Sequence, residues 1–212
     1  MKHLVIIGAR GAGREIYCAS LKTNEFKNRE YDIKGFLDDK LEALNETPGY
    51  PPILGSVENY EIQQDDVFIC ALGDPKWRRH YVEMLLKKNG EFINIIDPSV
   101  VIEKNTKVGV GCIIRNCSVI SCDVSIGNFV YIQPFCVIGH DSVIDDFCHL
   151  NSYAFMGGYS KLETMSIMQT RATLIPHKKV MCGGVIGAGS VAIRNVKAGT
   201  TVMGVPAVNI EN

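Results

Sequence analysis

The sequence predicts an α/β domain followed by a parallel β-helix, and two observations carry this prediction. In residues 1–95, short apolar runs that suit strands alternate with amphipathic runs that suit helices, which is typical of a parallel sheet covered by helices. From Ile96 to Ile186, every sixth residue is aliphatic or methionine, a period that neither an isolated helix nor an isolated strand produces. We therefore place the domain boundary between residues 95 and 96, with the second domain at 96–212.

The first domain is predicted to alternate strands with helices. The expected strands are 3–9, 31–39, 66–74 and 91–97, and the expected helices are 13–24 and 75–90. The first helix has Ile16 and Ala19 at the spacing of one helical face. The second opens with Pro75, which suits a first helical turn because it has no N–H to lose, and it stops at an Asn-Gly pair.

The sequence GARGAG at residues 8–13 joins the first strand to the first helix, where free N–H groups suit a phosphate. Its spacing is G-x-x-G-x-G, and Arg10 occupies the place of the second glycine of the dinucleotide-binding pattern. Because a side chain there would block a dinucleotide pyrophosphate, we expect Gly8 and Gly11 to hold a mononucleotide diphosphate rather than NAD. A tight turn that binds no ligand is the structural alternative.

Two acids and a glycine follow neighbouring strands of the predicted sheet. Asp38 and Asp39 end the second strand, and Gly73 ends the third. Because ligands of open α/β sheets bind at the carboxyl ends of the strands, we expect these residues to line the same pocket as the glycine loop. Solvated strand ends are the alternative interpretation.

Each six-residue unit of the second domain has an aliphatic anchor, a small or thin residue four positions later and, in several units, a glycine directly after the anchor. This pattern predicts that each hexapeptide forms one flat face of a triangular prism, so that eighteen residues complete a coil. Successive coils would stack at the strand spacing of about 4.8 Å. The later coils, at 157–184, keep the anchors but have lost most of these glycines.

The composition describes an ordinary globular protein. It is 46% hydrophobic and 21% charged with a net charge of −1, so it offers nucleic acid no basic footprint. The N-terminal stretch MKHLVIIGARG is too short for a signal peptide or a membrane span. We expect a cytoplasmic protein with neither a nucleic-acid partner nor a membrane span.

The eight cysteines contain no C-x-x-C pair, and we expect free thiols that act as small buried hydrophobes rather than disulfides or a metal site. Cys112, Cys136 and Cys148 all fall on the small-residue position of the repeat. The repeat therefore explains these three cysteines without a chemical role.

Four stretches carry a resemblance to a known family: IIGARGAGREI, GFLDD, VIGHDSVIDDFCHL and VMGVPAVNI. With the repeat, they resemble the left-handed β-helix hexapeptide-repeat acyltransferases. The whole chain is similar to the sugar acyltransferases that include sialic acid O-acetyltransferases and UDP-4-amino-sugar N-acetyltransferases. The resemblance implies a Rossmann-like N-terminal domain and a left-handed coil.

The resemblance also implies an acetyl-CoA-dependent acetyltransferase that is a homotrimer with active sites between subunits. The N-terminal domain would hold a nucleotide-linked sugar, and acetyl-CoA would lie between adjacent β-helices. His140, paired with Asp141, would be the general base on the amino group of the sugar. The residues implied in contact with acetyl-CoA are His149, Gly158, Gly187 and Ala188.

Other functions remain open from the sequence. O-acetylation of a sugar of the sialic acid type is the near alternative, because the residues do not decide between an amine and a hydroxyl. A zinc hydratase of the carbonic anhydrase type would need three histidines at a subunit boundary, with His140, His149 and His177 as candidates. A trimeric scaffold that binds sugar nucleotides without catalysis would account for the altered later coils.

Overall fold

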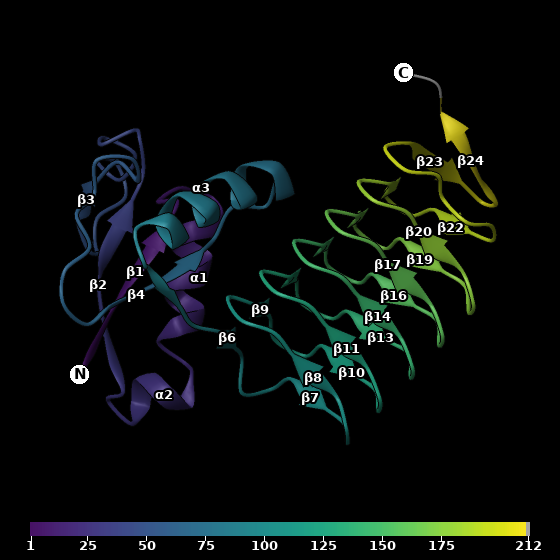
Figure 1. Ribbon diagram of the computed structural model, residues 1–212, viewed down its shortest axis with the longest axis horizontal. Helices are drawn as coiled ribbons and strands as arrows, with labels where there is room; N and C mark the ends of the chain where they lie inside the picture. The colour runs from purple at the N-terminus through teal and green to yellow at the C-terminus, as the bar shows by residue number, and fades with distance from the viewer. Residues whose placement is uncertain (211–212) are drawn as a thin grey trace. The chain divides into compact units, whose positions relative to one another are not determined.

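The computed structural model describes residues 1–210 and divides into two compact units, Met1–Pro98 and a second that begins at Ser99 (Figure 1). Each unit is formed by one continuous stretch of the sequence. Each is therefore described by itself.

The first unit is a five-stranded parallel sheet with the order β3-β2-β1-β4-β5. Its elements are β1 (Lys2–Ile7), α1 (Gly11–Ser20), α2 (Asn24–Lys27), β2 (Tyr31–Leu37), β3 (Ile53–Gly55), β4 (Asp66–Cys70), α3 (Pro75–Lys87) and β5 (Glu91–Phe92), followed by β6 (Ile95–Ile96). Leu4, Val5 and Ile6 have no exposed surface because β1 is the central strand.

Differences from the expected elements have local reasons. The predicted strand 91–97 is interrupted and becomes β5 and β6. Strand β3 was not predicted, because its three residues lie in a proline- and glycine-rich stretch with no strand period. Helix α1 begins two residues earlier than predicted, with Arg10 as a cap that makes no side-chain hydrogen bond.

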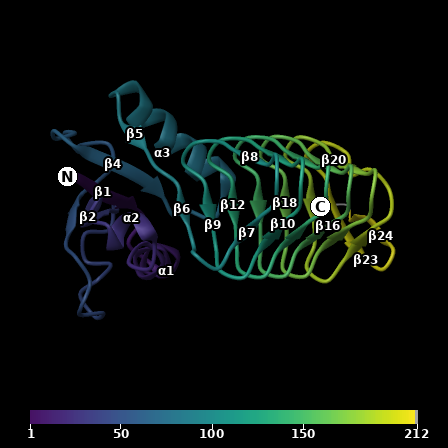
Figure 2. The same cartoon turned by 90° about the horizontal axis from the view of Figure 1, so that it is seen from below.

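The second unit is a parallel β-helix whose strands pair with strands eighteen residues away, such as Val119 with Val101 and Val137 (Figure 2). Its strands form three stacks, β22-β19-β16-β13-β10-β7, β20-β17-β14-β11-β8 and β21-β18-β15-β12-β9. They are β7 (Val101–Ile102), β8 (Lys107–Val108), β9 (Ile113–Ile114), β10 (Val119–Ile120), β11 (Ser125–Ile126), β12 (Tyr131–Ile132), β13 (Val137–Ile138), β14 (Val143–Ile144), β15 (His149–Leu150), β16 (Phe155–Met156), β17 (Lys161–Leu162), β18 (Ile167–Met168), β19 (Thr173–Leu174), β20 (Lys179–Val180), β21 (Val185–Ile186) and β22 (Val191–Ala192). An antiparallel hairpin, β23 (Thr201–Gly204) and β24 (Ala207–Ile210), extends the last stack.

The anchors of the repeat form the interior of the β-helix, as predicted. Ile120, Ile138, Leu150 and Met168 have no exposed surface. The first coil differs, because Ile102 is 38% exposed. The later coils that have lost their turn glycines keep the same strands and register, so the coil continues without those glycines.

The small-residue position is buried and makes a repeated hydrogen bond. The thiols of Cys136 and Cys148 donate to carbonyl oxygens fifteen residues ahead, at 3.2 and 3.1 Å, and the hydroxyl of Ser142 does the same at 3.1 Å. The expectation of buried thiols is wrong for Cys117 and Cys182, which are exposed and lie off that position, and for Cys18, which is exposed on α1 of the first unit.

Candidate functional site

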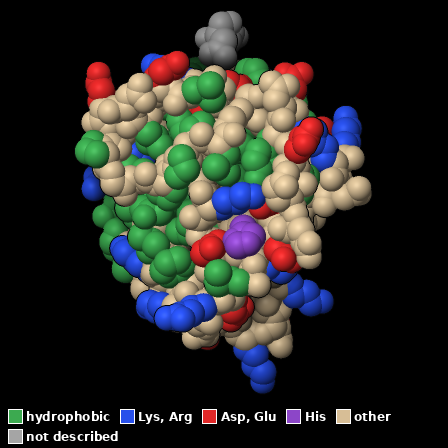
Figure 3. Space-filling model, turned by 90° about the vertical axis from the view of Figure 1, so that its left-hand side faces the viewer, with side chains coloured by type: hydrophobic (Ala, Val, Ile, Leu, Met, Phe, Trp, Pro, Cys, Tyr) green, Lys and Arg blue, Asp and Glu red, His purple; other side chains and the backbone are tan. Residues whose placement is uncertain are grey.

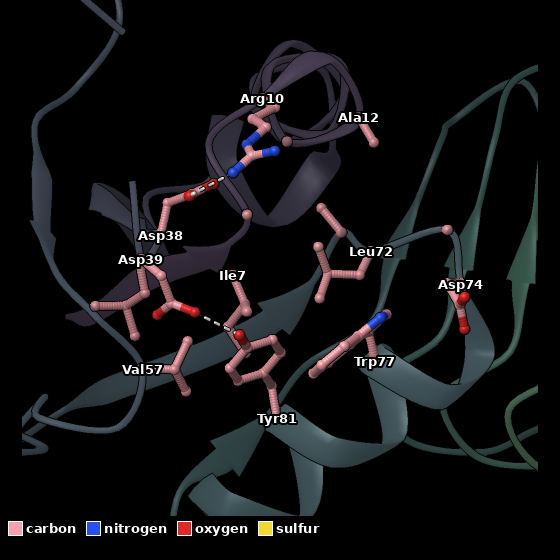
Figure 4. A pocket seen from close by; sticks show the side chains of 15 residues that line it. Ile7, Arg10, Ala12, Asp38, Asp39, Val57, Leu72, Asp74, Trp77 and Tyr81 are labelled. Atoms are coloured by element: carbon pink, nitrogen blue, oxygen red, sulfur yellow. Dashed lines mark hydrogen bonds and ion pairs between the residues drawn. The ribbon is translucent and has the colours of Figure 1, made fainter. Parts of the chain in front are cut away.

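A pocket of about 360 Å³ lies at the carboxyl edge of the sheet in the first unit (Figure 4). The ends of β1, β2 and β4 contribute to it, as the positions of Gly8, Asp38 and Gly73 show. Three strand ends and the start of α1 thus meet at one place. This is the edge where open parallel sheets bind ligands.

The glycine loop is shaped by close contacts. Gly8 has a φ of +93°, a conformation that favours glycine. A Cβ on Gly13 would lie 1.8 Å from the carbonyl oxygen of Gly8, so this glycine allows α1 to approach the loop. Gly11 is the first residue of α1 but does not line the pocket, whereas Arg10 does.

The two acids at the end of β2 have different partners. Oδ2 of Asp38 accepts the N–H of Ala9 at 2.9 Å, and its Oδ1 accepts the N–H of Lys40 at 3.0 Å and lies 3.8 Å from the guanidinium of Arg10. Asp38 therefore braces the glycine loop as well as lining the pocket. Asp39 accepts the hydroxyl of Tyr81 at 2.5 Å across the pocket.

The opposite wall is apolar and aromatic, and the sequence did not predict it. Leu72, Trp77 and Tyr81 line the pocket from the end of β4 and from α3 (Figure 4). The rings of Trp77 and Tyr81 are stacked, with centroids 6.2 Å apart and an interplanar angle of 29°. Their four-residue spacing on a predicted helix was the available signal.

Arg78 was also missed by sequence reasoning. It is 1% exposed, and its guanidinium donates to the carbonyl oxygens of Leu72 at 2.8 Å and Gly73 at 3.2 Å. Arg78 therefore holds the loop between β4 and α3 in the shape that lines the pocket. A charged residue in an amphipathic helix gives no sign of burial by itself.

In the second unit, His140 and Asp141 lie in the turn after β13. The Nδ1 atom of His140 is 2.8 Å from Oδ2 of Asp141, and the two side chains are 51% and 39% exposed. Because a carboxylate only accepts, this pair favours the tautomer with hydrogen on Nδ1. The Nε2 atom is then an acceptor on an exposed ring.

The next coil shapes the space around His140. Gly158 lies eighteen residues later, and a Cβ there would be 2.9 Å from Cε1 and Nε2 of the imidazole. The ring of Tyr159 meets His140 edge to face at 5.2 Å and stacks on His177 at 5.0 Å. The imidazole thus occupies space that any other residue at position 158 would fill.

His149, Gly187 and Ala188 lie elsewhere on the β-helix. His149 is in β15, only 3% exposed, with its ring 4.8 Å from that of Tyr131. Gly187 and Ala188 follow β21, which belongs to the same stack as β15. The structure brings His140, Asp141 and Gly158 together at one corner and keeps the other three residues in a different stack.

Two further observations concern the described residues. Between residues 1 and 210, no group of three or more His, Cys, Asp or Glu side chains is placed to hold a metal ion. No helix in that range is long and apolar enough to cross a membrane. On the face in Figure 3, Lys and Arg side chains lie beside Asp and Glu around an apolar area.

The first unit is an α/β domain with a pocket at its strand ends, and the second is a parallel β-helix with a paired histidine at one corner. Residues 3–85 match the family model of the PglD N-terminal domain, and residues 92–183 match that of the GMPPB C-terminal domain. The first unit is therefore similar to the PglD N-terminal domain over residues 3–85.

Solved structures share this fold along the whole chain. A histidine variant of perosamine N-acetyltransferase from Caulobacter crescentus, in complex with CoA and GDP-perosamine, is 21% identical with a TM-score of 0.88, over 100% of this chain and 98% of that one. The acetyltransferase domain of PglB from Neisseria gonorrhoeae is 24% identical with a TM-score of 0.85, over 99% and 100%. WeeI from Acinetobacter baumannii is 22% identical with a TM-score of 0.88, over 99% and 100%. These likenesses confirm the predicted fold class, an α/β domain followed by a left-handed parallel β-helix.

Proposed function

We propose that this protein transfers the acetyl group of acetyl-CoA to the amino group of a nucleotide-linked amino sugar. The observation that carries the proposal is the pairing of His140 with Asp141, which leaves Nε2 free to accept a proton at an exposed corner. The pocket of the first unit supports it, because glycine amides, acids and an aromatic wall suit a nucleotide.

In the proposed reaction, Nε2 of His140 takes a proton from the sugar amine as the amine nitrogen attacks the thioester carbonyl. The new C–N bond forms, the C–S bond breaks, and the departing sulfur of CoA takes up a proton. Asp141 holds the imidazole in the required tautomer and stabilises the imidazolium that forms. Asp141 is therefore a positioning residue.

Gly8, Arg10, Asp38, Asp39 and Gly73, which line the pocket, are proposed to hold the nucleotide sugar, and Gly11, which does not line it, is proposed to contribute as the first residue of α1. Phosphate at the start of α1 would be favoured by the free N–H groups of that helix and by Arg10. Asp38 and Asp39 would accept hydroxyl groups of the ligand. Amine rather than hydroxyl acceptance is supported by the similar structure that contains GDP-perosamine.

We also propose that the active protein is a homotrimer with acetyl-CoA between subunits. His149, Gly187 and Ala188 lie in a different stack from His140, so a site that uses both sets needs residues from two chains. One stack carries a row of exposed apolar side chains that would be covered by a neighbouring copy. The row consists of Val101, Val119, Val137 and Phe155.

The test is thiol release from acetyl-CoA with a panel of UDP- and GDP-linked amino sugars and CMP-sialic acid. We expect turnover with an amino sugar, an N-acetyl product, and a loss of about 100-fold or more in His140→Ala. An O-acetyl product would support the sugar O-acetyltransferase alternative. Nucleotide-sugar binding with no thiol release would overturn the proposal and support the non-catalytic scaffold.

A further inference from the structure

Trp77 is the one tryptophan of the chain, and it lies on the wall of the pocket in the first unit. It is 57% exposed, although indole is the largest apolar side chain. Asp74 caps α3 by accepting the N–H of Lys76 at 2.7 Å, so the helical turn that carries Trp77 is held in place. An ordered, unburied aromatic ring on a pocket wall is suited to receive the ring of a ligand.

Tyr81 makes this wall rigid. It stacks on Trp77 at 6.2 Å and is tied to the end of β2 by its hydrogen bond to Asp39. That hydrogen bond, together with burial, raises the pKa of Tyr81 to about 12. Trp77 and Tyr81 therefore form one fixed surface, here called the aromatic platform.

The pocket has two sides of different character (Figure 4). Arg10 and the start of α1 lie on one side, where a diphosphate is favoured. Asp38 and Asp39 lie at the end of β2, where acids of parallel α/β folds accept ribose hydroxyls. A base joined to that ribose would lie against the aromatic platform, because Tyr81 of the platform is hydrogen-bonded to Asp39.

We propose that Trp77 is the stacking surface for the nucleobase of the ligand. The inference rests on the proposed nucleotide site and adds the residue that recognises the base. Aromatic stacking tolerates different bases because every base has a π face. The platform therefore binds the base without choosing between uracil and guanine.

Because Trp77 is the sole tryptophan, its emission reports its own contact. We would titrate the full-length protein with UDP and GDP, and with inorganic pyrophosphate and ribose 5-phosphate, which carry phosphate but no base. We expect the two nucleotides to change the emission in a saturable way and the base-free compounds to change it little. An equal response to pyrophosphate, or no response to either nucleotide, would overturn the inference.

Variants then measure the contribution to affinity by calorimetry. Trp77→Leu is expected to weaken nucleoside diphosphate binding on the order of tenfold, and Trp77→Phe less, because a smaller ring still stacks. Leu86→Ala, which alters another exposed apolar residue of α3, is the matched control and should bind like the native protein. Unchanged affinity in Trp77→Leu would contradict the assignment.

Thiol release from acetyl-CoA separates this inference from the proposed function. Saturable quenching by nucleotides without acetyl transfer would leave the stacking role intact and overturn the acetyltransferase. Acetyl transfer, together with native nucleotide affinity in Trp77→Leu, would support the acetyltransferase and overturn the stacking role of Trp77. Thermal melting of each variant confirms that the first unit remains folded.

Discussion

At the scale of single residues, the position of His140 depends on the absence of a side chain in the neighbouring coil. His140 has its ring above Gly158, and its Nδ1 atom is held by Asp141. The family resemblance of the sequence predicted the histidine and its carboxylate. The role of Gly158 in leaving room for the imidazole required the register of eighteen residues, since only stacking brings positions 140 and 158 together.

Gly158→Ala tests this arrangement. Its Cβ would lie 2.9 Å from Cε1 and Nε2, so the imidazole has to move away. Because a misplacement of about 1 Å costs on the order of 100-fold in a positioned catalytic group, we expect a loss of up to that order in thiol release. Nucleotide affinity, which belongs to the other unit, should not change. Native activity in this variant would show that the observed ring position is not the reactive one.

At the scale of elements, the coils share a strained corner. A positive φ recurs every six residues in the β-helix, from Asn105 at 61° to His177 at 60°, and most of these positions hold residues other than glycine. Left-handed backbone costs a residue with a side chain about 1–2 kcal/mol. The register of the coils imposes this conformation whatever the side chain is, so the sequence period of the anchors did not reveal it.

Cys117→Gly is expected to stabilise the β-helix. Cys117 is exposed with a φ of 57°, so glycine relieves the strain while adding entropy to the unfolded chain, for a net gain of about 0.5–1 kcal/mol. Cys122 is not among the positive-φ positions, and Cys122→Gly should lower stability instead. Thermal melting of both variants measures these changes in stability, and a lower Tm for Cys117→Gly would contradict the strain argument.

In the first unit, β2 and β4 are joined by a polar cluster. Burial alone would raise the pKa of Asp66, but hydrogen bonds from Lys34 at 2.6 Å, the N–H of Gln63 and the hydroxyl of Tyr60 together lower it. The charged carboxylate is thus favoured in the folded state. The stability that the ionised Asp66 contributes to the folded state is fully present above the unfolded pKa of about 3.9, and it is lost as pH falls through the lower folded pKa.

Asp66→Asn should therefore lower the free energy of unfolding by about 2 kcal/mol at pH 7, and by less at pH 3, which lies below the unfolded pKa of about 3.9, so that part of this stabilisation is already lost. Denaturant unfolding at the two pH values measures this difference. Asp65→Asn alters the exposed neighbour and serves as the control. An equal loss at both pH values would show that charge is not what the cluster stabilises.

At the scale of the whole molecule, the row formed by Val101, Val119, Val137 and Phe155 is the feature that a single chain leaves unexplained. Under the proposed trimer, Val137→Glu is expected to shift the protein towards monomer, because a charge in the centre of an apolar interface is costly. Light scattering after gel filtration measures the mass. Leu41→Glu, at an exposed apolar residue of the first unit, should leave the mass unchanged, and a Val137→Glu protein with native mass would exclude this stack as the interface.

The sequence by itself determined the order of the two folds, the six-residue coil and the glycine loop. These features come from contacts that repeat at a fixed spacing or join neighbours in the chain, so a period or a motif records them. Only the tertiary structure decided the aromatic wall of Trp77 and Tyr81, the burial of Arg78 and the place of His140 over Gly158. The reason is physical: each depends on side chains brought together by strand stacking or by a loop turning back, and no local pattern of residue types specifies such an approach.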